Sequence, residues 1–522
     1  MKFLPSQLPI PIKDQSPSRF RWVTSQTSKI HRRSSTMAQT TIEQTTAAQL
    51  EQILDNAQKT SAQWALTPAA ERARIIEHAA AALEAAGDTL VALATEETNL
   101  PEARLRGELK RTAFQLGLFG ETIRDGACFD ARIDHADAQW PMGAARPDLR
   151  RILIPVGPVL VFAASNFPFA FSVAGGDTAS ALAAGNAVVL KAHSGHPKLS
   201  QATASIFAAA LEEAGAPEGL FSIIFGTASG SAAIEDPRIK AAGFTGSIPG
   251  GRALFDKANA RPEPIPFFGE LGSNNPVFVT SSAAASNAEG IVDQFIGSFT
   301  MGAGQFCTKP GTLVVPEDSN FTQILASKEL PAVHKLLNER IEAGYLQTLS
   351  QLKSHEGVEV LAQHPEAEND QIQPTLLVTT GEQLLADPQA LQEECFGPAA
   401  LVVTYKDEAQ LLEIAGSFSG QLTATICGEE SDDVAQLLFT LQNKAGRVLW
   451  NQWPTGVSVT YAQQHGGPYP ASTVANSTSV GTAAIIRFLR PVAYQGFPQN
   501  LLPAALQDNS EGTQLLNGQR QR

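Results

Sequence analysis

Cysteine is scarce in this chain, with four residues among 522, namely Cys128, Cys307, Cys395 and Cys427. Their wide separation excludes the close spacings of a disulfide framework or of a zinc site. We therefore expect no bound metal, and we expect a reducing compartment such as the cytoplasm. A cysteine with a special role in this chain would act as a thiol.

Clustered positive charge is also lacking. The formal net charge is −14, and no basic stripe follows residue 40. A nucleic-acid surface needs clustered Lys and Arg to displace counterions, so nucleic acids are not expected as partners.

Long uninterrupted apolar runs are lacking as well, because Pro155, Pro158 and Pro168 break the uncharged residues 152–176. That stretch predicts a buried strand, a loop and a helix, and no membrane span.

The N-terminal segment differs from the rest in composition. Residues 1–36 contain seven Lys or Arg and one acid, Asp14, among many Ser, Thr and Pro. Two interpretations remain open: an organelle transit peptide, which implies import, or a leader that precedes a true start at Met37. In both cases we expect residues 1–40 to be disordered and outside the fold.

The remaining composition is that of a globular protein, with 43% apolar and 17% charged residues, and the length predicts two or three lobes. Strands and helices alternate between residues 151 and 272, which predicts a doubly wound parallel sheet that binds ligands at the carboxyl ends of its strands. A second α/β run extends from residue 276 to about 450. Residues 498–522, rich in Gln and Asn, predict a flexible tail.

Three polar residues in apolar or glycine-rich surroundings are candidates for chemistry. Asn166 follows the buried strand and has an amide that could donate to an oxyanion, unless it only caps the next helix. Glu270 in "FFGELGSNNP" is expected to have a raised pKa suited to a general base, unless it forms a strand-end salt bridge. Cys307 in "FTMGAGQFCTKPG" lies among glycines that expose its thiol, whereas the other cysteines suit small buried hydrophobes.

Taken together, these segments resemble the aldehyde dehydrogenase superfamily from about residue 45 to residue 497. Six motifs occur in the order of that family: "SNFP", "VVLK", "FTGS", "ELGSNNP", "GQFCTKPG" and "EECFGP". The resemblance implies an α/β fold with a Rossmann-like dinucleotide-binding domain (residues 41–129 and 151–275), an α/β catalytic domain (276–477) and a small β oligomerisation extension (130–150 and 478–497). It also implies a homodimer or homotetramer.

The resemblance further implies oxidation of a small aldehyde to a carboxylic acid with a nicotinamide cofactor. Cys307 would be the nucleophile, Asn166 would hold the oxyanion, and Glu270 would activate the water that hydrolyses a thioester. The implied cofactor-binding residues are Lys191, Ser194, Gly226, Gly230, Ser247, Gly251, Glu394 and Phe396.

Two departures from the commonest family pattern indicate a narrower group. Ser194 stands three residues after Lys191, where members specific for NAD often carry a glutamate. A serine there does not repel a 2′-phosphate, so we expect a preference for NADP with some use of NAD. Downstream, "AQQHGGPYPAS" resembles the NADP-linked aldehyde dehydrogenases that include enzymes acting on 2,5-dioxopentanoate, also called α-ketoglutarate semialdehyde.

The predicted reaction is therefore oxidation of 2,5-dioxopentanoate to 2-oxoglutarate. Phe167 and Phe171 would line an apolar substrate tunnel, and Arg111 would bind the substrate carboxylate, although exposure to solvent is the more usual state of an arginine. His465 is also a candidate for substrate binding. It is either a plain loop residue or a neighbour of Cys307 that lowers the pKa of the thiol or helps to position the cofactor. The alternatives are a broad-specificity or fatty aldehyde dehydrogenase using NADP, a noncatalytic protein of the same fold, or a thiol hydrolase using Cys307 and His465.

Overall fold

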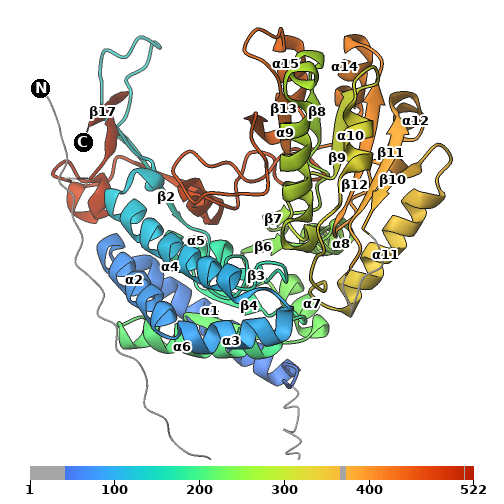
Figure 1. The fold of residues 1–522 in the computed structure, drawn as a ribbon. Helices are drawn as coiled ribbons and strands as arrows, with labels where there is room; N and C mark the ends of the chain where they lie inside the picture. The colour runs from blue at the N-terminus through green and yellow to red at the C-terminus, as the bar shows by residue number, and fades with distance from the viewer. Residues whose placement is uncertain (1–41, 365–371, 511, 522) are drawn as a thin grey trace, which may run out of the picture. The chain divides into compact units, whose positions relative to one another are not determined.

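The structure is a computed structural model that describes residues 42–364, 372–510 and 512–521, and Figure 1 shows how their helices and strands are arranged. The leader predicted for residues 1–40 lies outside the described residues. Three β-sheets organise the described part of the chain, two with five strands and one with seven.

Helices form the N-terminal part of the described chain: α1 (Ala47–Leu66), α2 (Ala69–Ala85), α3 (Gly87–Thr98) and α4 (Glu102–Asp125), followed by the short η1 (Ala127–Phe129). Apolar residues at helical spacing bury one face of α2, including Ile75, Ile76 and Leu83. Helix α2 packs against α4, and α4 in turn packs against α5 (Gly176–Ala184). Helix α4 therefore lies against the first sheet, where its polar side chains can reach a strand-end loop.

The alternation predicted for residues 151–272 forms a parallel sheet with strand order β5-β4-β3-β6-β7. This is the doubly wound order: β4 and β5 are added on one side of β3, and β6 and β7 are added on its other side. The prediction of a doubly wound parallel sheet is therefore confirmed. The strands are β3 (Val159–Phe162), β4 (Val188–Lys191), β5 (Phe221–Ile224), β6 (Ala241–Thr245) and β7 (Phe267–Glu270). The helices after α5 are α6 (Pro197–Glu213), α7 (Thr227–Glu235) and α8 (Ile248–Ala260).

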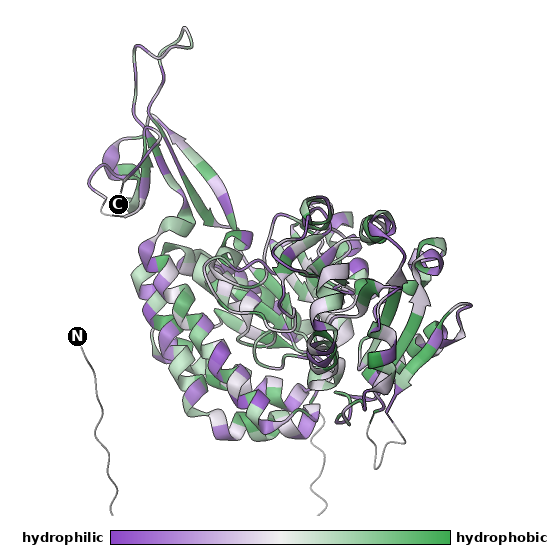
Figure 2. Cartoon of the chain, turned by 45° about the horizontal axis from the view of Figure 1, so that its top comes forward, coloured by the Kyte–Doolittle hydropathy of each residue, from purple (hydrophilic) through white to green (hydrophobic). Residues whose placement is uncertain are grey.

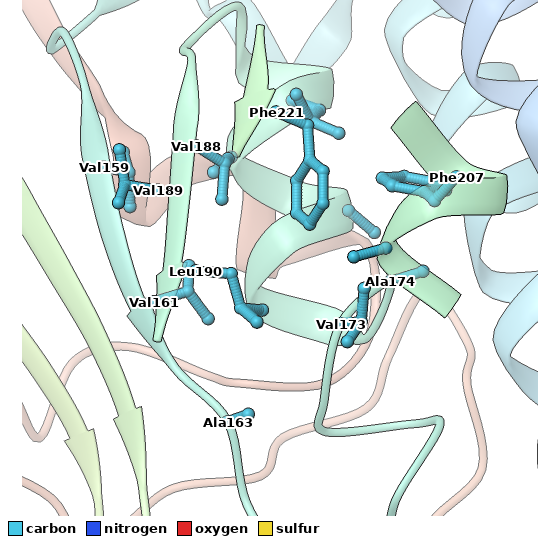
Figure 3. Packing of buried hydrophobic residues seen from close by; sticks show 14 of the residues in the cluster. Val159, Val161, Ala163, Val173, Ala174, Val188, Val189, Leu190, Phe207 and Phe221 are labelled. Atoms are coloured by element: carbon cyan, nitrogen blue, oxygen red, sulfur yellow. The ribbon is translucent and has the colours of Figure 1, made fainter. Parts of the chain in front are cut away.

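Apolar strand residues hold this sheet to its helices, as the close view in Figure 3 shows. Val188 and Leu190 of β4 are fully buried. Phe221 of β5 meets Phe207 of α6 edge to face, with ring centroids 5.2 Å apart. Such a pair contributes about 0.5–1.5 kcal/mol beyond the burial of its area. The strand ends are thereby held on a rigid base.

The second α/β run forms a seven-stranded sheet of order β10-β11-β12-β9-β8-β13-β14, parallel except for the edge strand β10. Its strands are β8 (Val277–Val279), β9 (Thr312–Pro316), β10 (Glu359–Gln363), β11 (Thr375–Thr380), β12 (Ala399–Tyr405), β13 (Gln421–Cys427) and β14 (Ala445–Trp450). Its helices are α9 (Ser281–Thr300), η2 (Met301–Gly304), α10 (Phe321–Ser327), α11 (Glu339–Ser354), α12 (Gly381–Ala386), α13 (Pro388–Leu391), α14 (Glu408–Ser417) and α15 (Ala435–Gln442).

A third sheet, of order β15-β2-β1-β16-β17, combines the two ranges predicted as a β extension with the C-terminal segment. Its elements are β1 (Ala131–Asp134), β2 (Leu149–Pro155), η3 (Thr482–Phe488), β15 (Leu489–Gln495), η4 (Gln499–Leu501), η5 (Ala504–Leu506), β16 (Gln514–Leu516) and β17 (Gln519–Gln521). The prediction of a flexible tail is wrong for the described residues 498–510 and 512–521. Strand β16 pairs with β1, and Leu502 and Leu506 are buried against Ile133 and Ile152.

Hydropathy follows this architecture. In Figure 2 the strands of the sheets are coloured mainly as hydrophobic, whereas the helices alternate between hydrophobic and hydrophilic residues. Within the described ranges, no helix has the length and apolar character needed to span a bilayer.

Candidate active site

The first sheet brings four of the predicted site residues to one edge. Lys191 and Glu270 are the last residues of β4 and β7, Asn166 lies in the loop after β3, and Ser247 follows β6. Because the carboxyl ends of parallel strands meet at the same edge, residues distant in sequence come together there.

Cys307 lies in the loop that follows η2, and its residue is half-buried. Residues Gly302, Ala303 and Gly304 have φ values of 58°, 55° and 68°, so the chain turns sharply before the cysteine. A Cβ at Gly304 would lie 2.1 Å from the carbonyl oxygen of Gly397, and only glycine permits this approach. Asn275 fixes the loop on its other side, because its Nδ2 donates to the Cys307 carbonyl at 2.8 Å.

Side-chain atoms of Cys307, His465 and Glu270, which are distant in the sequence, lie close together beside this loop. The Nε2 atom of His465 lies 2.8 Å from Oε1 of Glu270 and 3.5 Å from Sγ of Cys307. The side chains of His465 and Glu270 are 1% and 3% exposed. Ser479 Oγ donates to the other oxygen of Glu270. The interpretation of His465 as a neighbour of Cys307 is confirmed, and a role of His465 in the chemistry stays a prediction.

The pKa expected for Glu270 requires a correction. Burial alone raises the pKa of this carboxyl, but the charge of His465 and hydrogen bonds from His465 and Ser479 outweigh burial, so its pKa is lowered. The predicted rise is therefore wrong. For Cys307, burial raises the pKa of the thiol well above its ordinary value, and the negative charge of Glu270 raises it further. The thiol at rest is therefore predominantly protonated at neutral pH.

Helix α4 positions the loop that carries Asn166. Arg104 Nη2 donates to the Asn166 carbonyl at 2.7 Å, and Glu108 Oε1 accepts from the backbone N–H groups of Phe169 and Ala170 at 2.8 and 3.0 Å. Asn166 Nδ2 donates to the Gln305 carbonyl at 3.1 Å, two residues before Cys307. An amide NH₂ has two donors, so one remains for a substrate oxygen.

Aromatic rings form one wall beside these groups. Phe167 and Phe171 lie 5.5 Å apart, Phe167 contacts Phe306 at 5.2 Å, and Phe171 lies 6.1 Å from the ring of His465. The two phenylalanines predicted to line the tunnel therefore pack together and extend as far as the histidine beside Cys307.

Two arginines of α4 stack on this aromatic wall. Arg111 lies over Phe171 at 5.7 Å, and Arg104 lies over Phe167 and Phe306 at 5.1 and 4.7 Å. Both residues are half-buried, so the alternative of an exposed Arg111 is wrong, and its role toward a substrate carboxylate stays a prediction. The buried Nη1 atom of each has no hydrogen-bond partner within the described part of the chain. Unpaired buried donors are costly unless an anion binds them.

Sequence reasoning missed Arg104 and Glu108. The available signal was their spacing from Arg111, because residues 104, 108 and 111 share one face of a helix. Ser479 and Asn275 gave no comparable signal, since their partners are distant in the sequence.

The predicted pyrophosphate residues lie at the starts of α7 and α8. Gly226 precedes α7 with φ +107°, and a Cβ at Gly230 inside that helix would lie 3.0 Å from Cγ of Lys191. Ser247 caps α8, where its Oγ accepts from the Gly250 N–H at 3.4 Å. A Cβ at Gly251 would lie 2.1 Å from the side chain of Leu271, so this helix start packs closely on the sheet. Helix N-termini of this kind fit phosphate groups.

Two positively charged residues, Lys191 and Arg340, lie near each other where the adenosine ribose is expected to bind. Burial lowers the pKa of Lys191, and the charge of Arg340 at the start of α11 lowers it further. Burial and the neighbouring charges of His196, Lys191 and Arg340 lower the pKa of His193 to about 3. Ser194 is exposed beside these groups. Arg340 belongs to the segment that carries the second sheet, and sequence reasoning missed it.

Glu394 faces a cavity of about 930 Å³, together with Ile248, Gly272 and Gln421. Burial raises the pKa of this carboxyl to about 7, although the charge of Lys309 opposes the rise. A Cβ at Gly272 would lie 2.3 Å from Oε2 of Glu394, so glycine keeps room for the carboxylate. Phe396 lies two residues later and is half-buried. The cavity lies beside α8 and has a size that fits part of a dinucleotide.

Comparisons with known proteins agree with this geometry. Residues 22–485 match the Aldehyde dehydrogenase family. The alpha-ketoglutaric semialdehyde dehydrogenase of Acinetobacter baylyi is 45% identical over 490 residues, which cover 91% of this chain and 92% of that protein. Alpha-ketoglutaric semialdehyde dehydrogenase 2 of Azospirillum brasilense is 42% identical over 454 residues, covering 85% and 86%.

The fold also matches solved structures. The NADP-dependent glyceraldehyde-3-phosphate dehydrogenase of Bacillus halodurans, complexed with NADP, aligns with a TM-score of 0.72 at 20% identity and covers 86% of this chain and 91% of that one. The chain therefore belongs to the aldehyde dehydrogenase family, whose members oxidise small aldehydes with a nicotinamide cofactor.

Proposed function

We propose that this protein oxidises 2,5-dioxopentanoate to 2-oxoglutarate, with NADP as the preferred cofactor. The observation that carries the proposal is the pair of buried, unpartnered Nη1 atoms of Arg104 and Arg111. These arginines lie on the aromatic wall beside Cys307, Glu270 and His465, which we call the catalytic cluster. A substrate with an aldehyde at one end and a carboxylate at the other can present the aldehyde to the thiol of Cys307 and accept hydrogen bonds from the guanidinium groups with its carboxylate. A plain aliphatic aldehyde leaves the two donors unpaired.

The names of the two relatives support the same substrate. Both act on alpha-ketoglutaric semialdehyde by name, and each aligns with at least 85% of this chain. A broad-specificity or fatty aldehyde dehydrogenase would favour an apolar pocket, and two partly buried arginines oppose a long apolar chain there.

The proposed chemistry begins at Cys307. Its sulfur attacks the aldehyde carbon while the carbonyl electrons move to oxygen, and the Asn166 amide and the Cys307 backbone N–H stabilise the resulting oxyanion. Because the pKa of the thiol is raised, its proton must leave as the bond forms, and it passes to a water molecule, since Nε2 of the neighbouring His465 already donates to Glu270. A bound nicotinamide cofactor would supply the hydride acceptor, and loss of the hydride from the reacting carbon would leave Cys307 joined to the substrate as a thioester.

Hydrolysis of the thioester is assigned to Glu270. A water molecule gives a proton to the carboxylate and attacks the acyl carbon, and the acid is released as the sulfur regains a proton. The lowered pKa of Glu270 keeps the carboxylate ionised and ready to accept that proton. His465 and Ser479 hold the two carboxylate oxygens and orient the base.

The NADP preference rests on the charges at the end of β4. Lys191 and Arg340 supply two positive charges near Ser194, and serine offers a hydroxyl donor to a 2′-phosphate. The remaining cofactor assignments are Gly226 and Ser247 at the pyrophosphate and Glu394 at the nicotinamide ribose.

Assembly and location are also part of this proposal. The β1–β2–β15 sheet is the segment that we expect to pair subunits in a homodimer or homotetramer. All four cysteines are free, which suits a reducing compartment such as the cytoplasm.

The test is a steady-state comparison of the purified protein with 2,5-dioxopentanoate, a plain five-carbon aldehyde, NADP and NAD. We expect the highest kcat/KM for the semialdehyde with NADP. Equal values for the two aldehydes would contradict the substrate, and a higher value with NAD would contradict the cofactor preference. An ester assay without cofactor measures the thiol hydrolase alternative, which the contact between Cys307 and His465 permits as a side activity.

A further inference from the structure

The catalytic cluster also has the donor set of a transition-metal site. Sγ of Cys307, a ring nitrogen of His465 and a carboxylate oxygen of Glu270 all lie within 4.8 Å of one another. Thiolate, imidazole and carboxylate are the three protein ligand types that zinc uses. Sequence reasoning predicted no metal site because these residues are far apart in the chain.

The distances suit tetrahedral coordination. Zinc bonds of about 2.0–2.3 Å place ligand atoms roughly 3.3–3.7 Å apart in a tetrahedron. The Cys307 Sγ to His465 Nε2 distance of 3.5 Å lies in this range. The His465 Nε2 to Glu270 Oε1 distance of 2.8 Å must open by about half an ångström, which rotation of one side chain can supply.

Charge and burial favour a dication at this position. The side chains of Glu270 and His465 are 3% and 1% exposed, and Oε1 of Glu270 faces Nε2 of His465 at 2.8 Å inside the protein. A thiolate and a carboxylate together carry the two negative charges that neutralise Zn²⁺, which removes the repulsion between them. Ser479 donates to the second oxygen of Glu270 and orients this ligand from outside the site.

We propose that Cys307, His465 and Glu270 bind Zn²⁺ reversibly in the cofactor-free protein, with water in the fourth position, and that the bound metal inhibits aldehyde oxidation. The sulfur–zinc bond forms as the thiol proton leaves to solvent, the nitrogen–zinc bond forms as Nε2 of His465 releases its proton to solvent, and no electron is transferred. Inhibition follows because the sulfur lone pair that attacks the aldehyde is held by the metal, and the base of the hydrolysis step is held as well.

Equilibrium dialysis of the full chain against ZnCl₂, without cofactor, tests the stoichiometry and the ligands. We expect one zinc per chain and loss of dehydrogenase activity that EDTA restores. Cys307→Ser and His465→Phe should each weaken binding roughly 100-fold or more, since loss of a supporting partner alone costs about 10–100-fold. Ser479→Ala should weaken it roughly tenfold. Cys128→Ser is the matched control, because this half-buried thiol lies outside the cluster, and its binding should equal that of the parent.

A spectroscopic measurement separates this site from adventitious binding. Co²⁺ bound to the parent and to Cys128→Ser should show a thiolate-to-metal charge-transfer band, which Cys307→Ser should lack. Parent protein alkylated by iodoacetamide provides the same comparison without a substitution, if a variant fails to fold. The proposal would be overturned by any of four results: unchanged zinc affinity after alkylation, absence of the cobalt band, full affinity in His465→Phe, or full activity with one zinc bound.

Discussion

Replacement of Arg111 by methionine should remove selectivity for an aldehyde that carries a carboxylate. Methionine retains the length of the side chain and its packing on Phe171, but it removes the charge that lies 5.7 Å above that ring. A hydrogen bond to a charged group contributes about 1.5–3 kcal/mol, which corresponds to about 10- to 150-fold in kcat/KM. We expect a loss of this size for 2,5-dioxopentanoate with NADP, measured by the absorbance of the reduced cofactor.

The plain five-carbon aldehyde is the internal comparison for Arg111→Met. It has no carboxylate to bind, so its kcat/KM should change by no more than about threefold, in line with the small effect of removing a group that the substrate does not contact. Arg106→Met is the matched control on the same helix, since Arg106 is exposed and pairs with Glu102 and Asp88. Equal losses for both aldehydes in Arg111→Met would refute the carboxylate assignment.

Arg104 provides a contrasting case. Its Nη2 donates to the carbonyl of Asn166, whereas its Nη1 has no partner in the described chain. Arg104→Met should therefore lower kcat/KM for the plain aldehyde as well, because the oxyanion loop loses a support. A selective loss for the semialdehyde alone would show that the contact with Asn166 has no catalytic importance.

Three further predictions concern the catalytic cluster and the cofactor site. Glu270→Gln should give a burst of reduced cofactor followed by slow turnover, which rapid mixing measures, and loss of the burst itself would indicate a structural role. The same variant should shift alkylation of Cys307 to lower pH, because the charge that raises the thiol pKa is gone, and alkylation at several pH values measures this shift. His465→Ala should alter the pH profile of Cys307 alkylation, and an unchanged profile would rule out a role of His465 toward the thiol. Ser194→Glu should raise the KM for NADP about 30-fold and leave NAD unaffected or improved, because a carboxylate repels a phosphate of nearly two charges by about 2 kcal/mol; equal effects on both cofactors would contradict the placement of the 2′-phosphate.

Local patterns predicted the first sheet and the positions of its site residues. Buried strands alternating with helices permit one main topology, and the carboxyl ends of those strands bring Lys191 and Glu270 to a common edge. The glycines around Cys307 predicted a sharp turn, and three consecutive positive φ values in residues 302–304 agree with it.

The errors all depend on partners that are distant in the sequence. The pKa of Glu270 is lowered because His465 and Ser479 come from a loop near the C-terminus. Arg111 is half-buried because α4 packs on the loop that contains Phe171. The segment expected to be a flexible tail is ordered in the described residues because β16 finds a free edge on β1. Composition and periodicity contain no information on such pairings.

Mass spectrometry of the Glu270→Gln variant tests directly whether Cys307 is the residue that carries the acyl group. The variant is mixed with 2,5-dioxopentanoate and NADP, quenched in acid within the burst phase, and digested for peptide mapping. We expect a mass increase equal to the acyl group of 2-oxoglutarate on the peptide that contains Cys307, and no increase when NADP is omitted and the thiohemiacetal reverses in the quench. A burst of reduced cofactor with an unmodified Cys307 peptide, or an acyl group on another residue, would contradict this assignment.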